Sequence, residues 1–165
     1  MRYRAHEVAQ ACQGRLLAGP ADAWVTGVST DSRRVRPGDA FVALRGQHAD
    51  GHAFVAEAFA RGASAATVST WPLPGLNDGQ GVTGAVIGVD DPLRALGRWA
   101  AAHRRRFRVP AVAVTGSVGK TTTKEMIAAV VERRFRVLKS PGNFNNELGV
   151  PLGMLAWNAA HGVAV

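Results

Sequence analysis

The sequence predicts an α/β protein in which a small α/β domain precedes the beginning of a parallel-sheet domain that binds nucleotide phosphates. In residues 1–90, short apolar segments typical of buried strands alternate with helical patterns. A further apolar segment, residues 111–114, runs into a glycine turn followed by lysine, which is the layout of a phosphate-binding loop. We therefore divide the chain into a first domain over residues 1–90 and a second, incomplete (truncated) domain over residues 91–165.

The first domain is expected to contain two helices and four strands. The helices are predicted over residues 5–13, ended by Gly14, and over residues 52–61, ended by Gly62. The strands are predicted over residues 24–29, 40–44, 65–68 and 85–89. Residues 71–84 are rich in Pro and Gly and are expected to form an exposed loop.

Residues 90–165 contain signals for three further helices and three strands. Asp90-Asp91-Pro92 is typical of a helix start, and that helix is predicted to end near Phe107. Beyond it we expect a strand over residues 111–114, helices over 121–135 and 148–157, and short strands at 137–138 and 162–165.

Charge is distributed unevenly along the 165 residues, whose formal net charge is +8. Residues 1–91 hold eight Lys and Arg against nine Asp and Glu, whereas residues 92–165 hold twelve against three. The second part therefore favours an anionic partner. Nucleotide phosphates explain part of this charge, and nucleic acid is the competing explanation.

The cysteine content and the hydropathy indicate the compartment. The single cysteine, Cys12, excludes an internal disulfide framework and suits the reducing cytoplasm, where we expect the protein to be. We expect Cys12 to be buried on the first helix, and Trp99 and Trp157 to be core residues. No apolar run approaches the roughly 20 residues of a membrane span.

The phosphate-binding loop predicts an ATP site. Backbone N–H groups of a glycine turn can surround phosphate oxygens, and the positive end of the following helix adds to the attraction. Lys120 supplies charge to the terminal phosphates, and the hydroxyl of Thr121 can bind Mg²⁺. The residues predicted to line the phosphates are Gly116, Ser117, Val118, Gly119, Lys120, Thr121 and Thr122. The alternative is an ordinary strand–turn–helix corner, since the common eight-residue motif has glycine where this chain has Val114.

Enzymes with a phosphate-binding loop also need a carboxylate that helps to hold Mg²⁺, usually at the end of a nearby strand. The acids after Pro92 are Glu125, Glu132 and Glu147, and none of them follows an apolar strand. We therefore expect the metal-holding acid to lie beyond Val165, and the chain to be an inactive fragment of a longer enzyme.

Three segments together carry a family resemblance. They are Ser29-Thr30-Asp31-Ser32-Arg33 with residues 37–52, the loop from Thr115 to Thr122, and residues 142–151. They resemble the Mur ligases of peptidoglycan synthesis, and the third segment with Lys124-Glu125 is most similar to the members that add D-alanyl-D-alanine. The resemblance implies an ATP-driven amide ligation. In that reaction the terminal carboxylate of UDP-N-acetylmuramoyl-tripeptide becomes an acyl phosphate, which the amine of D-alanyl-D-alanine attacks.

The resemblance also implies roles for individual residues. Lys120 and Thr121 would be the catalytic residues, with ATP and Mg²⁺ as cofactors. The UDP end of the substrate would contact Thr30, Ser32, Arg33, Gln47, His48 and Ala49, while Asn143, Asn145 and Asn146 would lie beside the reacting end. Asp31 and Arg33 would brace their loop, or Arg33 would instead face the pyrophosphate. We expect a monomer.

Several alternatives stay open at this point. They are the sister ligase that adds the third peptide residue, a non-catalytic module that binds nucleotides or UDP-sugars, and a basic P-loop protein that acts on nucleic acid. The basic run of residues 103–108 lacks interleaved aromatics beyond Phe107, so we interpret it as a solvated helix end and expect no nucleic-acid partner. His48, Asp50 and His52 have the spacing of metal ligands on an extended segment, but Asp50 more simply caps the helix that follows.

Overall fold

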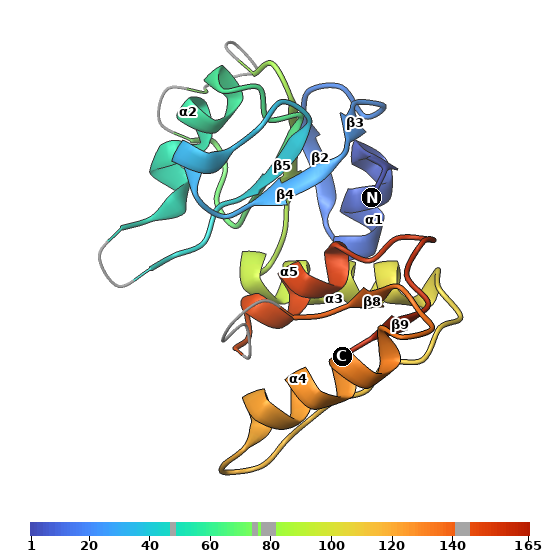
Figure 1. Ribbon diagram of the computed structural model, residues 1–165. Helices are drawn as coiled ribbons and strands as arrows, with labels where there is room; N and C mark the ends of the chain where they lie inside the picture. Colours follow the sequence, from blue (N-terminus) through green and yellow to red (C-terminus); the bar gives the residue numbers. More distant parts are fainter. Residues whose placement is uncertain (47–48, 74–75, 77–81, 141–145) are drawn as a thin grey trace. The chain divides into compact units, whose positions relative to one another are not determined.

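The computed structural model describes residues 1–46, 49–73, 76, 82–140 and 146–165. The chain divides into two compact units, Met1–Trp99 and Ala100–Val165, whose elements are labelled in Figure 1. Helix α3 (Pro92–Arg105) contributes residues to both units, whereas the predicted boundary near residue 90 precedes that helix. The assignment of a separate function to each domain stays a prediction.

The first unit is built on a five-stranded sheet of order β2-β7-β6-β5-β4. Its strands are β2 (Arg15–Ala18), β4 (Gly27–Ser29), β5 (Asp39–Val42), β6 (Ala65–Val68) and β7 (Ala85–Gly88). Strands β4 to β7 are parallel, and β2 joins the edge antiparallel to β7. All four residues of β6 are buried, as expected for a parallel strand covered on both faces. The predicted mixed α/β fold is confirmed.

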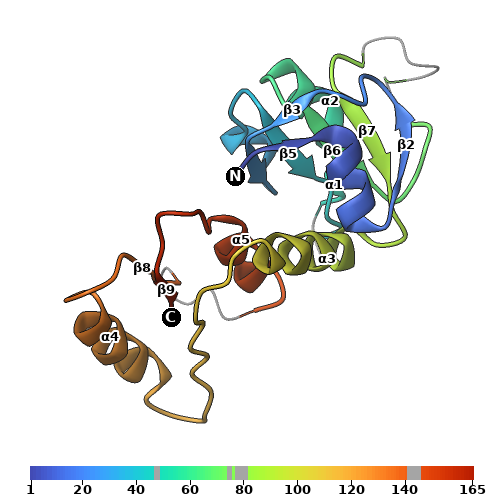
Figure 2. The same ribbon diagram turned by 90° about the vertical axis from the view of Figure 1, so that its right-hand side faces the viewer.

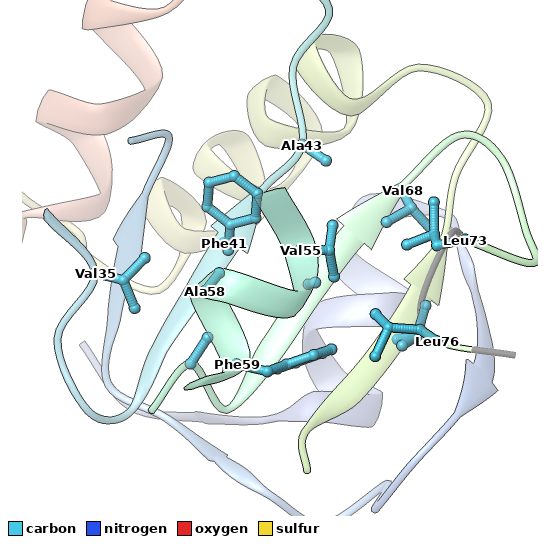
Figure 3. Close-up of a cluster of buried hydrophobic side chains, with 12 residues drawn as sticks. Val35, Phe41, Ala43, Val55, Ala58, Phe59, Val68, Leu73 and Leu76 are labelled. Carbon is cyan, nitrogen blue, oxygen red and sulfur yellow. The ribbon is translucent and has the colours of Figure 1, made fainter. Parts of the chain in front are cut away.

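Two helices pack on this sheet. Helix α1 (Ala5–Cys12) contacts β2 and β7, beside which it lies in Figure 2, and α2 (Val55–Ala60) contacts β6. Figure 3 shows the core under α2, where Val55 and Phe59 pack with Phe41, Leu73 and Leu76. Leu73 and Leu76 are each 2% exposed, so the prediction of a wholly exposed loop over residues 71–84 is wrong at these positions.

The structure divides two predicted elements of the first unit. The predicted strand over residues 24–29 becomes β3 (Trp24–Val25), which pairs with β1 (Tyr3–Arg4), and β4, which belongs to the main sheet. The predicted helix over residues 52–61 begins as a 3₁₀ helix, η2 (Gly51–Phe54), and continues as α2. A second 3₁₀ helix, η1 (Ser32–Arg34), follows β4.

Helix α1 ends differently from the prediction. Gln13, at φ 57°, adopts the left-handed conformation that closes the helix, and Gly14 follows it. A side chain at Gly14 would lie 2.6 Å from the carbonyl oxygen of Gly88. The glycine is therefore needed for a close approach to β7, and strand β2, which the sequence did not predict, begins directly after it.

The second unit contains the end of α3, the helices α4 (Lys120–Val131) and α5 (Gly149–Leu155), and two short strands. The strands β8 (Val137–Leu138) and β9 (Val163–Ala164) pair in parallel, as the sequence predicts. The predicted strand over residues 111–114 is wrong in extent, because Ala111 forms a single bridge with Ala164. Its partner β9 has two residues, which is too short to pair a longer segment.

Helix α3 begins where the sequence predicts. The Asp91 carboxylate accepts hydrogen bonds from the backbone nitrogens of Leu93 (2.8 Å) and Arg94 (2.9 Å). The helix ends at Arg105, two residues earlier than expected, and α4 ends at Val131 rather than Phe135. In the part of the chain that the structure describes, no helix has both the length and the apolar character needed to cross a membrane.

Candidate active site

The phosphate-binding loop joins the bridged residue Ala111 to helix α4. Its glycines Gly116 (φ 146°) and Gly119 (φ 81°) both adopt backbone conformations that side chains disfavour. Gly119 is the cap residue of α4, and no side chain caps the helix there. The first backbone N–H groups of α4 are therefore available to an anion, which the positive end of the helix attracts.

The ammonium group of Lys120 lies within this loop. Its Nζ atom donates to the carbonyl oxygen of Gly116 at 2.5 Å and lies 3.4 Å from that of Ser117. The loop thus curls around the lysine, and residues 115–119 are exposed. Phosphate oxygens entering the loop would meet both the ammonium group and the amide groups, so the donor set fits a triphosphate.

Lys120 and Thr121 line a cavity of about 350 Å³ in the second unit. Its walls are mostly apolar, with contributions from residues 111–114 and from Trp157 near the end of α5. Lys124 and Ser140 add polar groups to the lining. The cavity therefore combines an apolar wall with Lys120 and Thr121, two of the residues predicted to bind phosphate.

Among the residues of this unit that the structure describes, few side chains are placed to bind Mg²⁺. Thr121 supplies one hydroxyl oxygen, which fits the single protein ligand that the loop motif predicts. Glu125 is already paired with another side chain, because its Oε2 atom accepts a hydrogen bond of 2.7 Å from Lys139. This bond lowers the pKa of Glu125. The described residues contain no group of three or more His, Cys, Asp or Glu that could hold a metal ion.

Two of the predicted UDP-binding residues, Thr30 and Ala49, lie near the carboxyl ends of parallel strands in the first unit. Thr30 directly follows β4, and Ala49 lies in the loop that follows β5. This edge is where open parallel sheets usually bind ligands. Ala49 is exposed, and its carbonyl oxygen accepts a hydrogen bond from Gly46 (2.9 Å). Gln47 and His48 lie outside the described residues.

Arg33 and Asp31 brace the turn after β4. The Arg33 guanidinium donates to both carboxylate oxygens of Asp31, at 3.0 and 2.9 Å, and its backbone nitrogen donates to Oδ1 at 3.0 Å. These bonds lower the pKa of Asp31. Ser32 is 7% exposed, and its hydroxyl donates to Glu57 of α2 at 3.0 Å. The bracing interpretation of Arg33 thus has geometric support, while substrate contacts of Ser32 and Arg33 stay predictions.

His52 is buried at 6% exposure and connects η2 to the loop after β6. Its Nδ1 atom lies 2.5 Å from Asp50, and its Nε2 atom accepts from the backbone nitrogen of Ser69 at 2.9 Å. The Asp50 carboxylate also accepts from the His52 backbone nitrogen (3.0 Å), so the predicted cap is confirmed. Both ring nitrogens are occupied, which leaves His52 without a lone pair for a metal ion.

The third predicted segment is described in part. Asn143 and Asn145 lie outside the described residues. Asn146 accepts a hydrogen bond from the backbone nitrogen of Gly149 at 2.6 Å and so supports the start of α5. The sequence did not indicate roles for Glu57, Ser69 or Lys139. Their contacts join residues 14 to 25 positions apart, for which a single sequence gives no local signal.

Comparison with known families identifies the class of protein. Residues 25–104 match the model described as "Mur ligase family, catalytic domain", and residues 114–165 match the "Mur ligase middle domain". The first match includes the loops that follow β4 and β5, and the second includes the phosphate-binding loop from Thr115 to Thr122. The chain belongs to the Mur ligase family.

Individual relatives show which members of the family this chain resembles. The chain is 44% identical to the UDP-N-acetylmuramoyl-tripeptide–D-alanyl-D-alanine ligase of Synechocystis over 87% of its own length and 31% of that protein. It is 39% identical to the ligase of the same name from Escherichia coli, over 88% of this chain and 30% of the relative. The chain thus spans about a third of the length of these relatives.

Solved structures show the same likeness. A crystal structure of MurF from Acinetobacter baumannii superposes on all of this chain with a TM-score of 0.89 at 36% identity, covering 35% of that protein. MurF ligase from Thermotoga maritima in complex with ADP matches 86% of this chain with a TM-score of 0.74 at 33% identity, covering 31% of that protein.

Proposed function

We propose that this chain is part of an ATP-dependent carboxylate–amine ligase that joins D-alanyl-D-alanine to UDP-N-acetylmuramoyl-tripeptide. The observation that carries the proposal is the open phosphate-binding loop from Gly116 to Thr121, capped by Gly119 at the start of α4. The names of the relatives supply the two substrates. The neighbour solved with ADP supports the use of a nucleotide.

In the proposed reaction, ATP supplies the phosphoryl group that activates the terminal carboxylate of the tripeptide. The amine of D-alanyl-D-alanine then displaces phosphate from the acyl phosphate. Lys120 would offset negative charge on the transferred group, and the amides that begin α4 would hold the neighbouring oxygens. Thr121 would give Mg²⁺ one oxygen ligand. In this reaction the protein would act mainly by positioning the reactants and by stabilising the negative charge of the transferred phosphoryl group.

The first unit would hold the UDP end of the substrate. Thr30 and Ala49 lie at the same edge of the parallel sheet, which supports this proposal. The remaining proposed contacts are Ser32, Arg33, Gln47 and His48, with Asn143 and Asn146 proposed beside the reacting end. We place the activity in the cytoplasm, because ATP is abundant there and the one cysteine is unpaired.

The test uses the whole protein and the Lys120→Ala substitution. We expect phosphate release that depends on D-alanyl-D-alanine to fall about a hundredfold or more, since one charge-stabilising group is removed. Calorimetric binding of UDP-N-acetylmuramoyl-tripeptide should stay within about twofold, because that site is proposed on other residues. Arg133→Ala, an exposed cation just beyond α4, is the matched control.

Two outcomes would contradict the proposal. Joint loss of ATP use and of UDP-substrate binding in Lys120→Ala would mean that the two sites are assigned to the wrong segments. Phosphate release that requires a UDP-dipeptide and a single amino acid, rather than D-alanyl-D-alanine, would assign the protein to the sister ligase that adds the third residue.

A further inference from the structure

We propose that Lys124 is a positioning residue of this ligase, which together with Glu125 and Lys139 fixes Ser140 in the wall of the cavity beside the phosphate-binding loop. We call Lys124, Glu125 and Lys139 the lysine clasp. The contacts of the clasp stand by themselves. Its effect on turnover rests on the proposed function.

The first contact of the clasp joins a side chain to the backbone. Lys124 lies one helical turn after Lys120 on α4, and it is 8% exposed. Its Nζ atom donates to the carbonyl oxygen of Ser140 at 2.8 Å. A buried ammonium group is costly unless it is paired and hydrogen-bonded, so this lysine is held by specific partners.

The second contact joins two lysines through one carboxylate. Glu125 Oε1 lies 3.4 Å from the Nζ atom of Lys124, and its Oε2 atom accepts from Lys139 at 2.7 Å. The same hydrogen bond lowers the pKa of Glu125 and raises that of Lys139, so both groups stay charged at neutral pH. Residues 139 and 140 are therefore attached to α4 at two successive points, one by a side chain and one by the backbone.

Ser140 is the part of the wall that these contacts hold. Its backbone nitrogen donates to the carbonyl oxygen of Val165 at 3.0 Å, so the residue is tied both to the segment after β9 and to α4. Ser140, Lys124, Lys120 and Thr121 line the same cavity. The clasp thus holds Ser140 in the same cavity lining as Lys120 and Thr121.

The substitution Lys124→Met tests this arrangement, because methionine fills the space of lysine but has no hydrogen-bond donor. In Lys124→Met the Ser140 carbonyl loses its partner, and the wall can shift relative to Lys120. A misplacement of about 1 Å costs about a hundredfold in the rate of an aligned reaction. Phosphate binding itself depends on the loop and on Lys120, which the substitution leaves in place.

The experiment measures kinetics and hydrogen exchange in the whole protein. For Lys124→Met we expect kcat for D-alanyl-D-alanine-dependent phosphate release to fall between about tenfold and about a hundredfold, with KM for ATP within about threefold. Glu125→Gln and Lys139→Met weaken the second contact but keep the donor to Ser140, so they should lower kcat and speed exchange of the Ser140 amide less than Lys124→Met does. Arg133→Met, which removes an equal charge from an exposed site, is the matched control.

Hydrogen exchange provides a reading that does not need activity. The amide of Ser140, bonded to Val165, should exchange several-fold faster in Lys124→Met than in the parent or in Arg133→Met. Unchanged exchange together with kcat within twofold of the parent would overturn the proposal. If the parent has no ligase activity, the proposed function fails, and the exchange measurement still decides whether the clasp holds Ser140.

If Lys124→Met does not fold, Glu125→Gln and Lys139→Met test the proposal in its place. Glu125→Gln and Lys139→Met alter more exposed side chains, with 47% and 38% exposure, and should fold. Faster exchange at Ser140 in both variants would support the clasp. Parent-like exchange in both would overturn it.

Discussion

The Nε2 atom of His52 lies 2.9 Å from the backbone nitrogen of Ser69, and this hydrogen bond joins η2 to the loop after β6. Because Nε2 accepts, the neutral ring carries its proton on Nδ1, which faces Asp50. With the Ser69 hydroxyl 3.1 Å from Nε2, the three residues have the order of a serine-hydrolase triad. The backbone N–H already uses the lone pair of Nε2, so the imidazole acts as a structural link and not as a base.

Removal of the His52 link should destabilise the first unit. His52→Ala leaves the Ser69 amide and part of the Asp50 carboxylate without their partner, which costs about 1–3 kcal/mol. Urea unfolding would measure this loss. Ser69→Ala keeps the backbone N–H, so its free energy of unfolding should change by less than about 0.5 kcal/mol. Equal losses in the two variants would show that the hydroxyl carries the link.

Gly51→Ala should damage the proposed UDP site without affecting ATP binding. A side chain at Gly51 would lie 2.7 Å from both the backbone nitrogen and the carbonyl oxygen of Leu44, so the loop after β5 must move. We expect the Kd for UDP-N-acetylmuramoyl-tripeptide to rise about tenfold, equivalent to about 1.4 kcal/mol, as measured by calorimetry. Gly97→Ala in α3 meets no atom within 4 Å and is the control, expected to bind normally.

Gly119→Ala isolates the backbone conformation of the phosphate-binding loop. A side chain there meets no atom within 4 Å, so the cost comes from φ 81° and is about 1–2 kcal/mol. Relief of that strain would reshape the loop, and ATP affinity measured by nucleotide titration should fall. Gly97→Ala, in α3 and equally unobstructed, should leave ATP affinity unchanged. Similar affinities in the two variants would contradict the assigned role of Gly119.

Cys12 should make the first unit less stable in alkali. Burial raises the pKa of its thiol from 9.0 to about 12. Between these values the unfolded thiol ionises while the native thiol keeps its proton, so ionisation favours the unfolded state. The free energy of unfolding should therefore fall by about 1.4 kcal/mol per pH unit in that range. Cys12→Ala should lack this contribution in urea titrations at pH 9 to 11, and an equal slope in both proteins would refute it.

Local signals in the sequence predicted the parts of the fold that depend on neighbours in the chain. Asp50 and Asp91 each cap the helix that follows them, and the glycine turn before Lys120 leads into α4. The buried positions predicted for Cys12 and Trp157 are also confirmed. These features follow from side chains that act within a few residues or from strong apolar character.

Features that depend on distant partners were missed. Strand β2 exists because β7 pairs with it, although its sequence, Arg15 to Ala18, does not alternate. The basic run of residues 103–108 is interpreted above as a solvated helix end, and Arg105, Arg106 and Arg108 are exposed. His103 is instead 2% exposed, with Nε2 2.8 Å from the carbonyl oxygen of Trp157, and Arg104 lies over the Trp157 ring at 4.5 Å. The sequence pattern around His103 gives no signal for a partner that lies 54 residues away in the chain.

The stretch that enters the phosphate-binding loop is paired with β9 at Ala111 and Val112, whereas residues 115–119 are exposed. A ligand that fills the loop therefore contributes to the folding equilibrium of the second unit. By mass action, a nucleotide at 100 times its Kd raises the free energy of unfolding by about 2.7 kcal/mol. In the proposed ligase, the energy charge of the cell would then govern the resistance of this unit to heat and proteases as well as its rate of turnover.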